Sequence, residues 1–167
     1  MRFGKGAVAV LAATMMAVVA QAAMADESGT FRSLRSYHHD YLTIDHGGRT
    51  FTGGVITGTG TVIESSGGPF MAGSNRYSEC LVFSSSVDGT VSLLEAPCTD
   101  TDASGDILYS RAVREQGEVV AGGGGAGVWE LLGGTGKYAG VTGTCSYDTE
   151  YLEDVLVTIA DCTWSKA

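Results

Sequence analysis

Three charged side chains alternate with apolar residues in segments that have the pattern of β-strands. Glu79 lies in Arg76–Ser84, Arg111 lies in Asp106–Arg114, and Glu130 lies near the start of a glycine-rich hairpin. Residues two positions apart on a strand share a face, so each charge shares its face with apolar side chains. A carboxylate in an apolar pocket can act as a general acid or base, and an arginine there can bind an anion or an oxyanion. The pattern predicts a catalytic group of Glu79, Arg111 and Glu130.

The same three charges have a less specific explanation. An unpaired charge among apolar side chains is costly, so such residues usually pair with one another or lie at a barrel rim in contact with water. A strand register that slips by one residue also exchanges the two faces of the strand. Both alternatives stay open on the sequence alone.

A second group of residues forms the expected walls of a binding pocket. Tyr77 and Tyr109 share faces with the predicted catalytic residues of their strands, and Asp161 alternates with apolar residues of the last strand. In the run Tyr37-His38-His39-Asp40-Tyr41, the adjacent histidines point to opposite sides of a strand, so only one can face a pocket. The alternative for this run is a polar strand that faces solvent. We expect ligand contacts from five residues: Tyr77, Tyr109, His39, Tyr41 and Asp161.

The segment Asp100–Ile107 has a pattern that resembles a calcium-binding loop. It matches the first eight positions of an EF-hand loop, with Gly105 at position six. Position twelve is Arg111, where an EF-hand requires a bidentate glutamate, so an EF-hand is excluded. A weaker calcium-binding turn and an ordinary Asx turn both stay open. The histidines have no accompanying C-x₂-C pair, and we expect neither a metal nor an organic cofactor.

The N-terminus has the three parts of a secretory signal peptide. A basic region with Arg2 and Lys5 precedes the apolar residues 7–20, and Ala23-Met24-Ala25 is a cleavage site. A membrane anchor is the alternative, but the apolar stretch is shorter than the roughly 20 residues that span a bilayer. We therefore expect a signal peptide over 1–25, a single domain over 26–167, and a secreted or periplasmic protein with no membrane span after cleavage.

The chain is acidic, with a formal net charge of −9 at pH 7. An acidic domain repels phosphate backbones and anionic membrane surfaces, so we expect no nucleic-acid partner. Self-association of the domain stays open.

All four cysteines lie downstream of the expected cleavage site. An even number of cysteines after a signal peptide is typical of disulfides in an oxidising compartment. Three connectivities are possible. We expect Cys80–Cys98 and Cys145–Cys162, because each of these pairs is separated by one turn region and can lie on neighbouring strands.

The spacing of apolar residues and turn signals predicts an all-β fold. Beyond the signal peptide no window has a sustained helical period, and short strand-like segments recur about every 8–15 residues. This rhythm is typical of a sandwich or a small barrel. Glycine occurs within the strands as well as in turns, which favours a strongly curved sheet. We predict an up-and-down antiparallel barrel of about eight strands, stapled by disulfides, with residues 26–36 as a polar arm or short lead-in strand.

One hairpin supports a more specific expectation. Gly133-Gly134-Thr135-Gly136-Lys137-Tyr138-Ala139-Gly140-Val141-Thr142-Gly143 resembles the allene oxide cyclase and dirigent-like β-barrels, and more closely the small secreted bacterial proteins of that superfamily. The segment Cys98–Asp106 is similar to those bacterial proteins as well. The resemblance implies a calycin-like eight-stranded barrel whose lumen holds a small, largely apolar molecule. Plant members steer reactive intermediates without a metal or an organic cofactor. The matched glycines shape the barrel in those families, so the resemblance transfers no catalytic residue.

These observations together predict a secreted barrel that binds a small hydrophobic or aromatic molecule in its lumen. The enzymatic version is a cofactor-independent isomerase, cyclase or lyase that uses Glu79, Arg111 and Glu130. The alternative is a non-catalytic carrier or a dirigent-like guide protein. A barrel filled by its own side chains, with a structural or interaction role, is the third version.

Overall fold

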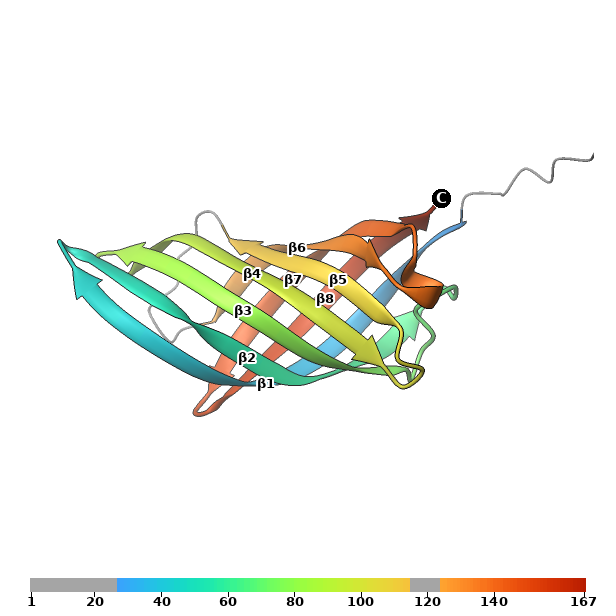
Figure 1. Cartoon of the computed structure of the whole chain (residues 1–167), viewed down its shortest axis with the longest axis horizontal. Helices are drawn as coiled ribbons and strands as arrows, with labels where there is room; N and C mark the ends of the chain where they lie inside the picture. Colours follow the sequence, from blue (N-terminus) through green and yellow to red (C-terminus); the bar gives the residue numbers. More distant parts are fainter. Residues whose placement is uncertain (1–26, 115–123) are drawn as a thin grey trace, which may run out of the picture.

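The computed structural model describes residues 27–114 and 124–167, which form a closed barrel of antiparallel strands (Figure 1). Each strand pairs with its neighbours in sequence, and the last strand pairs with the first. The predicted eight-stranded up-and-down barrel is therefore confirmed. The strands are β1 (Glu27–His46), β2 (Arg49–Ser65), β3 (Asn75–Val87), β4 (Thr90–Asp102), β5 (Ile107–Arg114), β6 (Gly125–Gly134), β7 (Val141–Leu152) and β8 (Val155–Lys166), and a 3₁₀ helix, η1 (Gly136–Tyr138), follows β6.

The N-terminal predictions have different outcomes. Residues 1–25, expected to be a signal peptide, lie outside the described residues. The polar segment 26–36 was expected to be an arm or a short lead-in strand, and the structure places it in the long strand β1 from Glu27 onward. Within the described residues, no helix has the length and apolar character needed to cross a membrane.

The two ends of the barrel are built differently. One end, which we call the closed end, carries the connections 66–74, 103–106 and 135–140. Phe70 from the first of these connections turns inward and stacks on Phe31 of β1, with ring centroids 4.0 Å apart. The ring of Trp164 on β8 packs beside Phe70 at 5.8 Å. These aromatic rings fill the closed end, whereas the opposite open end has the tight turns that join β1 to β2, β3 to β4 and β7 to β8.

Side chains alternate between the inside and the outside of the barrel, as the pleat of a strand requires. Inward apolar side chains form two clusters. The first lies at the closed end and includes Phe31, Phe70, Tyr138 and Trp164. The second lies toward the open end and includes Tyr37, Ile56, Val82 and Leu156.

Both predicted disulfides are confirmed. Cys80 pairs with Cys98 across β3 and β4, and Cys145 pairs with Cys162 across β7 and β8. All four cysteines are buried inside the barrel. Each disulfide therefore joins two strands directly opposite each other and identifies the inner face of both.

Candidate functional site

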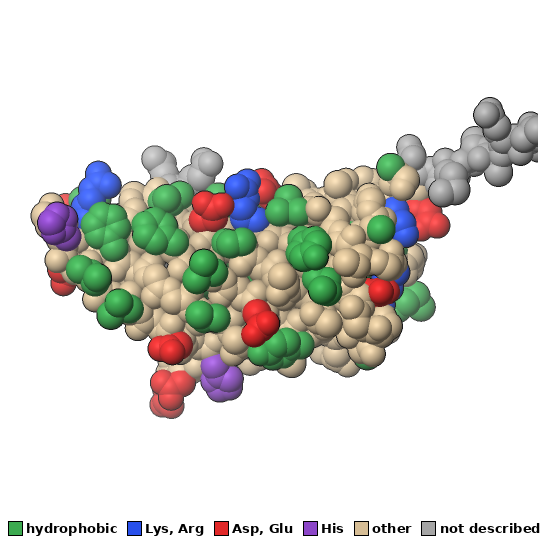
Figure 2. Space-filling view, in the orientation of Figure 1, with side chains coloured by type: hydrophobic (Ala, Val, Ile, Leu, Met, Phe, Trp, Pro, Cys, Tyr) green, Lys and Arg blue, Asp and Glu red, His purple; other side chains and the backbone are tan. Residues whose placement is uncertain are grey.

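The three predicted catalytic residues lie on the outside of the barrel. Arg111 donates hydrogen bonds to Glu130 from Nε at 3.0 Å and from Nη2 at 2.8 Å, and to Glu95 from Nη1 at 3.3 Å. This ion-pair group is partly exposed, and the outer face of the barrel mixes apolar and charged side chains (Figure 2). Glu79 also faces outward, between Tyr77 and Leu81. The expected placement of these residues in the lumen is wrong, whereas the alternative of charges that pair with one another in contact with water describes Arg111 and Glu130.

The physical reason for this error is visible on β3. Glu79 does share a face with its apolar neighbours, but that face is solvent-exposed: Tyr77 is 48% exposed and Leu81 is 63% exposed. The inner face of the same strand carries Arg76 and Ser78 together with Cys80. The outer row is thus the more apolar of the two. Polar residues can occupy the inner row because they have hydrogen-bond partners inside the barrel: Arg76 donates to Tyr138, and Ser78 donates to Asp100.

The predicted ligand-binding residues are divided between the two sides of the barrel. Tyr77 and Tyr109 are exposed on the outer face, and Asp161 forms an exposed ion pair with Arg32 at 3.4 Å. Only His39 and Tyr41 lie on the inward side of β1, near the open end, where their rings stack with centroids 4.8 Å apart. The structure therefore brings His39 and Tyr41 together, but not with the other three residues.

The acidic loop between β4 and β5 has a lysine as its cation. Oδ1 of Asp102 accepts hydrogen bonds from the backbone N–H and the hydroxyl of Ser104, at 2.8 and 2.6 Å, and from the backbone N–H of Asp106 at 3.1 Å. The other carboxylate oxygen lies 2.5 Å from Nζ of Lys137. The geometry supports the Asx turn rather than the calcium-binding turn. No group of three His, Cys, Asp or Glu side chains suited to a metal occurs in 27–114 or 124–167.

These contacts make Asp102 a source of stability that depends on pH. Burial opposes its ionisation, but hydrogen bonds from Lys137 and Ser104 outweigh burial and hold the pKa of Asp102 well below its usual value of 3.8. A carboxyl with a depressed pKa in the folded state stabilises the fold above its unfolded pKa, and this contribution is lost as the pH falls below about 4.

We therefore expect Asp102→Asn to lower the free energy of unfolding by about 1.5–3 kcal/mol at pH 7. The difference from the wild-type protein should shrink as the pH is lowered from about 4 toward 2, because the wild-type carboxyl then becomes protonated. Urea unfolding across this pH range measures both values, with Asp88→Asn in an exposed turn as the control. A difference that stays constant with pH would contradict the assignment.

A buried ion pair, which sequence reasoning missed, crosses the middle of the barrel. Nη1 of Arg35 on β1 donates hydrogen bonds to Oδ1 of Asp100 at 2.7 Å, to the hydroxyl of Ser78 at 3.1 Å and to the phenol oxygen of Tyr37 at 3.1 Å. Ser78 also donates to Oδ1 of Asp100, and Ser110 donates to Oδ2 at 3.3 Å. Arg35 is 1% exposed and Asp100 is fully buried.

The surroundings of this pair keep both groups charged. Burial alone would raise the pKa of Asp100, but the charges of Arg35 and Arg76, with hydrogen bonds from Arg35 and Ser78, lower it below its usual value. The guanidinium of Arg35 also lies 3.5 Å from the ring centroid of Trp129, a cation–π contact. Gly60 lies opposite both arginines, and a side-chain carbon there would collide with Arg35. The pair with its surrounding hydroxyls forms a polar layer across the lumen.

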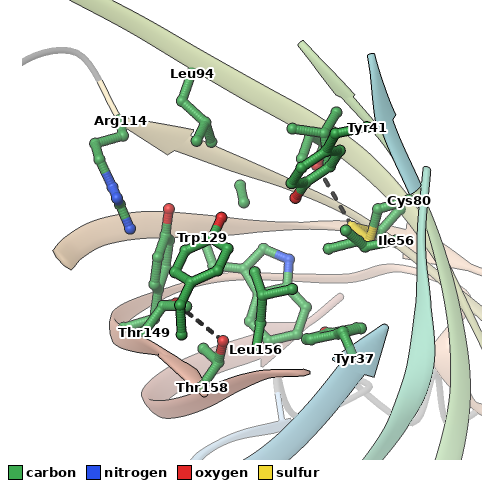
Figure 3. A pocket seen from close by; sticks show the side chains of 16 residues that line it. Tyr37, Tyr41, Ile56, Cys80, Leu94, Arg114, Trp129, Thr149, Leu156 and Thr158 are labelled. Atoms are coloured by element: carbon green, nitrogen blue, oxygen red, sulfur yellow. Dashed lines mark hydrogen bonds between the residues drawn. A yellow bond between two sulfur atoms is a disulfide. The ribbon is translucent and has the colours of Figure 1, made fainter. Parts of the chain in front are cut away.

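Above this layer, toward the open end, lies an apolar pocket (Figure 3). Its cavity has a volume of about 80 Å³, and all the free space including the part open to solvent amounts to about 630 Å³. Figure 3 shows Trp129 at the centre of the lining and Arg114 reaching in from β5. The walls are Tyr37, Tyr41, Ile56, Cys80, Val82, Leu94, Ala96, Cys98, Ala112, Arg114, Trp129, Tyr147, Thr149, Tyr151, Leu156 and Thr158.

The polar groups of the pocket are few. Arg114 donates from Nη2 to the backbone oxygen of Gly125 at 2.6 Å, and its guanidinium lies 5.5 Å from the ring centroid of Tyr147. Burial raises the pKa of Tyr147 despite the nearby charge of Arg114, and burial together with Tyr151 raises the pKa of Tyr41 far above its usual value. These phenols are therefore neutral hydrogen-bonding groups at physiological pH. The lining residues include no carboxylate and no imidazole.

Of the residues that form this site, the sequence prediction contained only Tyr41, Cys80 and Cys98. The signal for the inner face was present in the cysteines: a buried disulfide between Cys80 and Cys98 fixes the inward rows of β3 and β4, and with them Ser78 and Asp100. Comparison of the chain with protein-family models, with curated proteins and with solved structures finds no match. The resemblance to allene oxide cyclase and dirigent-like barrels stays a prediction.

Proposed function

We propose that the barrel binds a small, largely apolar or aromatic molecule in the open-end pocket and serves as a carrier or guide for it. The observation that carries the proposal is the pocket itself, an apolar space walled by aromatic rings and based on a hydrogen-bonded polar layer. Small-molecule sites have this composition, with mostly apolar walls and a few oriented polar groups. We place the protein outside the cytoplasm, because its two disulfides suit an oxidising compartment and its N-terminus resembles a signal peptide.

The volume of the pocket limits the ligand. The cavity of about 80 Å³ is smaller than the roughly 150 Å³ apolar cavity that holds benzene in an engineered protein. The free space around this cavity, about 630 Å³ in all, includes the part that is open to solvent at the mouth. The geometry thus suits a slim or flat molecule that inserts one end among the aromatic rings and leaves the other at the mouth. The inserted end meets Tyr37 and Trp129.

The carrier version fits the geometry better than the acid/base version. Glu79, Arg111 and Glu130 would have to reach the ligand to act as catalytic groups, and they lie on the outer face. The polar groups that do line the pocket are neutral phenols and hydroxyls together with the guanidinium of Arg114. They can hold and orient a molecule by hydrogen bonds and aromatic contacts without supplying a base.

Filling the pocket should weaken binding of an apolar probe by at least about tenfold, which is about 1.4 kcal/mol. Ala96→Leu and Ala112→Leu each add three carbon atoms to the lining and take up free space beside the cavity. The probe is N-phenyl-1-naphthylamine, whose fluorescence rises in an apolar site, and its affinity is measured by titration. The probe's position is read from quenching of Trp129 fluorescence, measured in a Trp164→Phe variant so that Trp129 is the remaining tryptophan.

The matched control is Thr99→Leu, on the same strand as Ala96 but on the exposed outer face. It should bind the probe as the wild-type protein does. Equal affinities for Ala96→Leu and Thr99→Leu in folded protein would place the probe elsewhere and contradict the proposal. Native mass spectrometry of protein purified from its own medium or periplasm then identifies the natural molecule that remains bound.

A further inference from the structure

Strand β1 is longer than the strand that closes the barrel against it. β1 pairs with β2 up to His46, which lies opposite Arg49, but it pairs with β8 only up to His38, which lies opposite Val155. Residues 39–46 therefore form one edge of a hairpin that projects beyond the barrel wall at the open end, on the left of Figure 1. No strand among the described residues pairs with this edge.

The backbone groups of this edge point away from β2. The carbonyl oxygens of Ser36 and Asp40 face β2, since a side-chain carbon at Gly58 or Gly54 would strike them. Backbone groups alternate in direction along a strand, so the N–H and C=O groups of Tyr41, Thr43 and Asp45 face the opposite edge. Below His38 the same edge is bonded to β8. An unpaired strand edge of this kind is a template for another strand.

We propose that this edge pairs with the same edge of a second copy of the chain, antiparallel and across a twofold axis at Thr43. In this register Thr43 lies opposite Thr43 of the second copy, and Tyr41 lies opposite its Asp45. Tyr41, Thr43 and Asp45 each then donate and accept one backbone hydrogen bond, so the free groups of these three residues all find partners. The contact is isologous, with the same patch on both copies, as in most symmetric dimers.

The side chains of the edge are complementary to themselves in this register. Leu42 is 69% exposed and Ile44 is 56% exposed on the outer face, and each lies opposite the other residue of the second copy. Asp40 lies opposite His46, so a carboxylate meets an imidazole. A slip by one residue would place Asp40 opposite Asp45 and turn the free backbone groups of one copy away from those of the other. Alternation and charge therefore favour the register with Thr43 on the axis.

The tips of the two hairpins also have complementary charge. His38, the last residue of β1 that pairs with β8, already lies opposite Val155, so the pairing with the second copy ends where Asp40 lies opposite His46, and residues 47 and 48 of that copy turn back toward its own β2. The tip of one copy, with Arg49, then comes beside the β7–β8 turn of the other, with Glu153 and Asp154. These contacts oppose the repulsion between two acidic chains, which is already screened beyond about 8 Å at physiological salt.

Analytical ultracentrifugation of protein secreted by its expression host tests the proposal. The protein is measured at 1–200 μM in about 0.15 M salt, the physiological ionic strength. The wild-type protein is expected to dimerise. Thr43→Pro removes an N–H that faces the free edge and leaves the bonds to β2, as proline at an edge position does. It should raise the dimer dissociation constant at least about tenfold, whereas Thr43→Val, which keeps the N–H, should not. A wild-type monomer at 200 μM, or a Thr43→Pro dimer as tight as the wild-type dimer, would overturn the proposal.

Cysteine cross-linking tests the register and does not depend on the proline variant. Leu42 and Ile44 of the two copies face each other at a non-hydrogen-bonded position, where side chains are closest. An equimolar mixture of Leu42→Cys and Ile44→Cys proteins should give a disulfide-linked dimer under mild oxidation, in a higher yield than either variant alone. Leu81→Cys is the control, since it is exposed on the outer face of β3, two strands from the edge. A yield from Leu81→Cys equal to that of the mixture would show that the copies meet through the barrel wall instead.

Discussion

Asp100→Ala is expected to lower the free energy of unfolding by about 3–5 kcal/mol, because it leaves the guanidinium of Arg35 buried without a counter-charge. Arg35 is 1% exposed, so bulk solvent does not screen the charge that is left behind. Its remaining hydrogen-bond partners, Ser78 and Tyr37, are neutral. Urea unfolding followed by tryptophan fluorescence measures the loss, and Trp129 reports on the pair directly because it stacks on Arg35.

Two further variants separate this effect from a general sensitivity to charge. Glu130→Gln breaks the ion pair with Arg111 on the outer face, where solvent screens both groups, and should leave the urea midpoint nearly unchanged. Arg35→Met combined with Asp100→Leu removes both buried charges and should be less destabilised than Asp100→Ala alone. If Asp100→Ala unfolded at the wild-type urea concentration, the pair would have no role in holding the polar layer.

The strand order and the disulfides could be predicted from local chemistry. Turn signals such as Asp88-Gly89 join successive strands by connections too short to reach any strand but the neighbour, and the structure has a tight turn there with φ of 77° at Gly89. The cysteine pairs are 18 and 17 residues apart, which is the length of two strand segments and one turn. Both features depend on residues close in sequence, so the sequence alone contains them.

The inside and the outside of the barrel could not be read from hydropathy. On β3 the outward residues Tyr77, Leu81 and Phe83 are more apolar than the inward Arg76 and Ser78. An arginine can lie inside only when distant residues supply its counter-charge and hydrogen bonds, and Asp100 is 65 residues from Arg35 in sequence. Alternation gives the period of a strand correctly, but it does not say which of its two faces is covered.

The polar layer also explains why the pocket is shallow. The guanidinium of Arg76, which lies two residues from Ser78 on β3 toward the closed end, is within 6 Å of three aromatic ring centroids, at 5.8 Å from Phe31, 5.2 Å from Phe70 and 5.9 Å from Tyr138. Together with Arg35 and Asp100 it fills the lumen between the closed end and the pocket. Within the lumen formed by the described residues, the space left for a guest therefore lies above this layer, where the lining includes two alanines and four tyrosines.

Removing both disulfides is expected to unfold the barrel at 37 °C. In the chain-entropy model a crosslink that closes a loop of 17 or 18 residues contributes about 3 kcal/mol, so the two together contribute about 6 kcal/mol. The whole stability of a domain is typically about 5–15 kcal/mol. Replacing all four cysteines with alanine, which leaves no buried hydroxyl in place of sulfur, should therefore lower the midpoint of thermal unfolding strongly or abolish folding, as followed by circular dichroism.

The two disulfides should differ in what their single removal does to the pocket. Each paired replacement is expected to cost about 3 kcal/mol and leave a folded barrel. Cys80→Ala with Cys98→Ala changes two residues of the pocket lining and should alter the affinity for N-phenyl-1-naphthylamine, because the disulfide forms part of the wall. Cys145→Ala with Cys162→Ala lies in the closed-end cluster and should leave that affinity unchanged at a temperature where both variants are folded. An equal change in affinity for both pairs would mean that the pocket depends on the stability of the whole barrel rather than on its own wall.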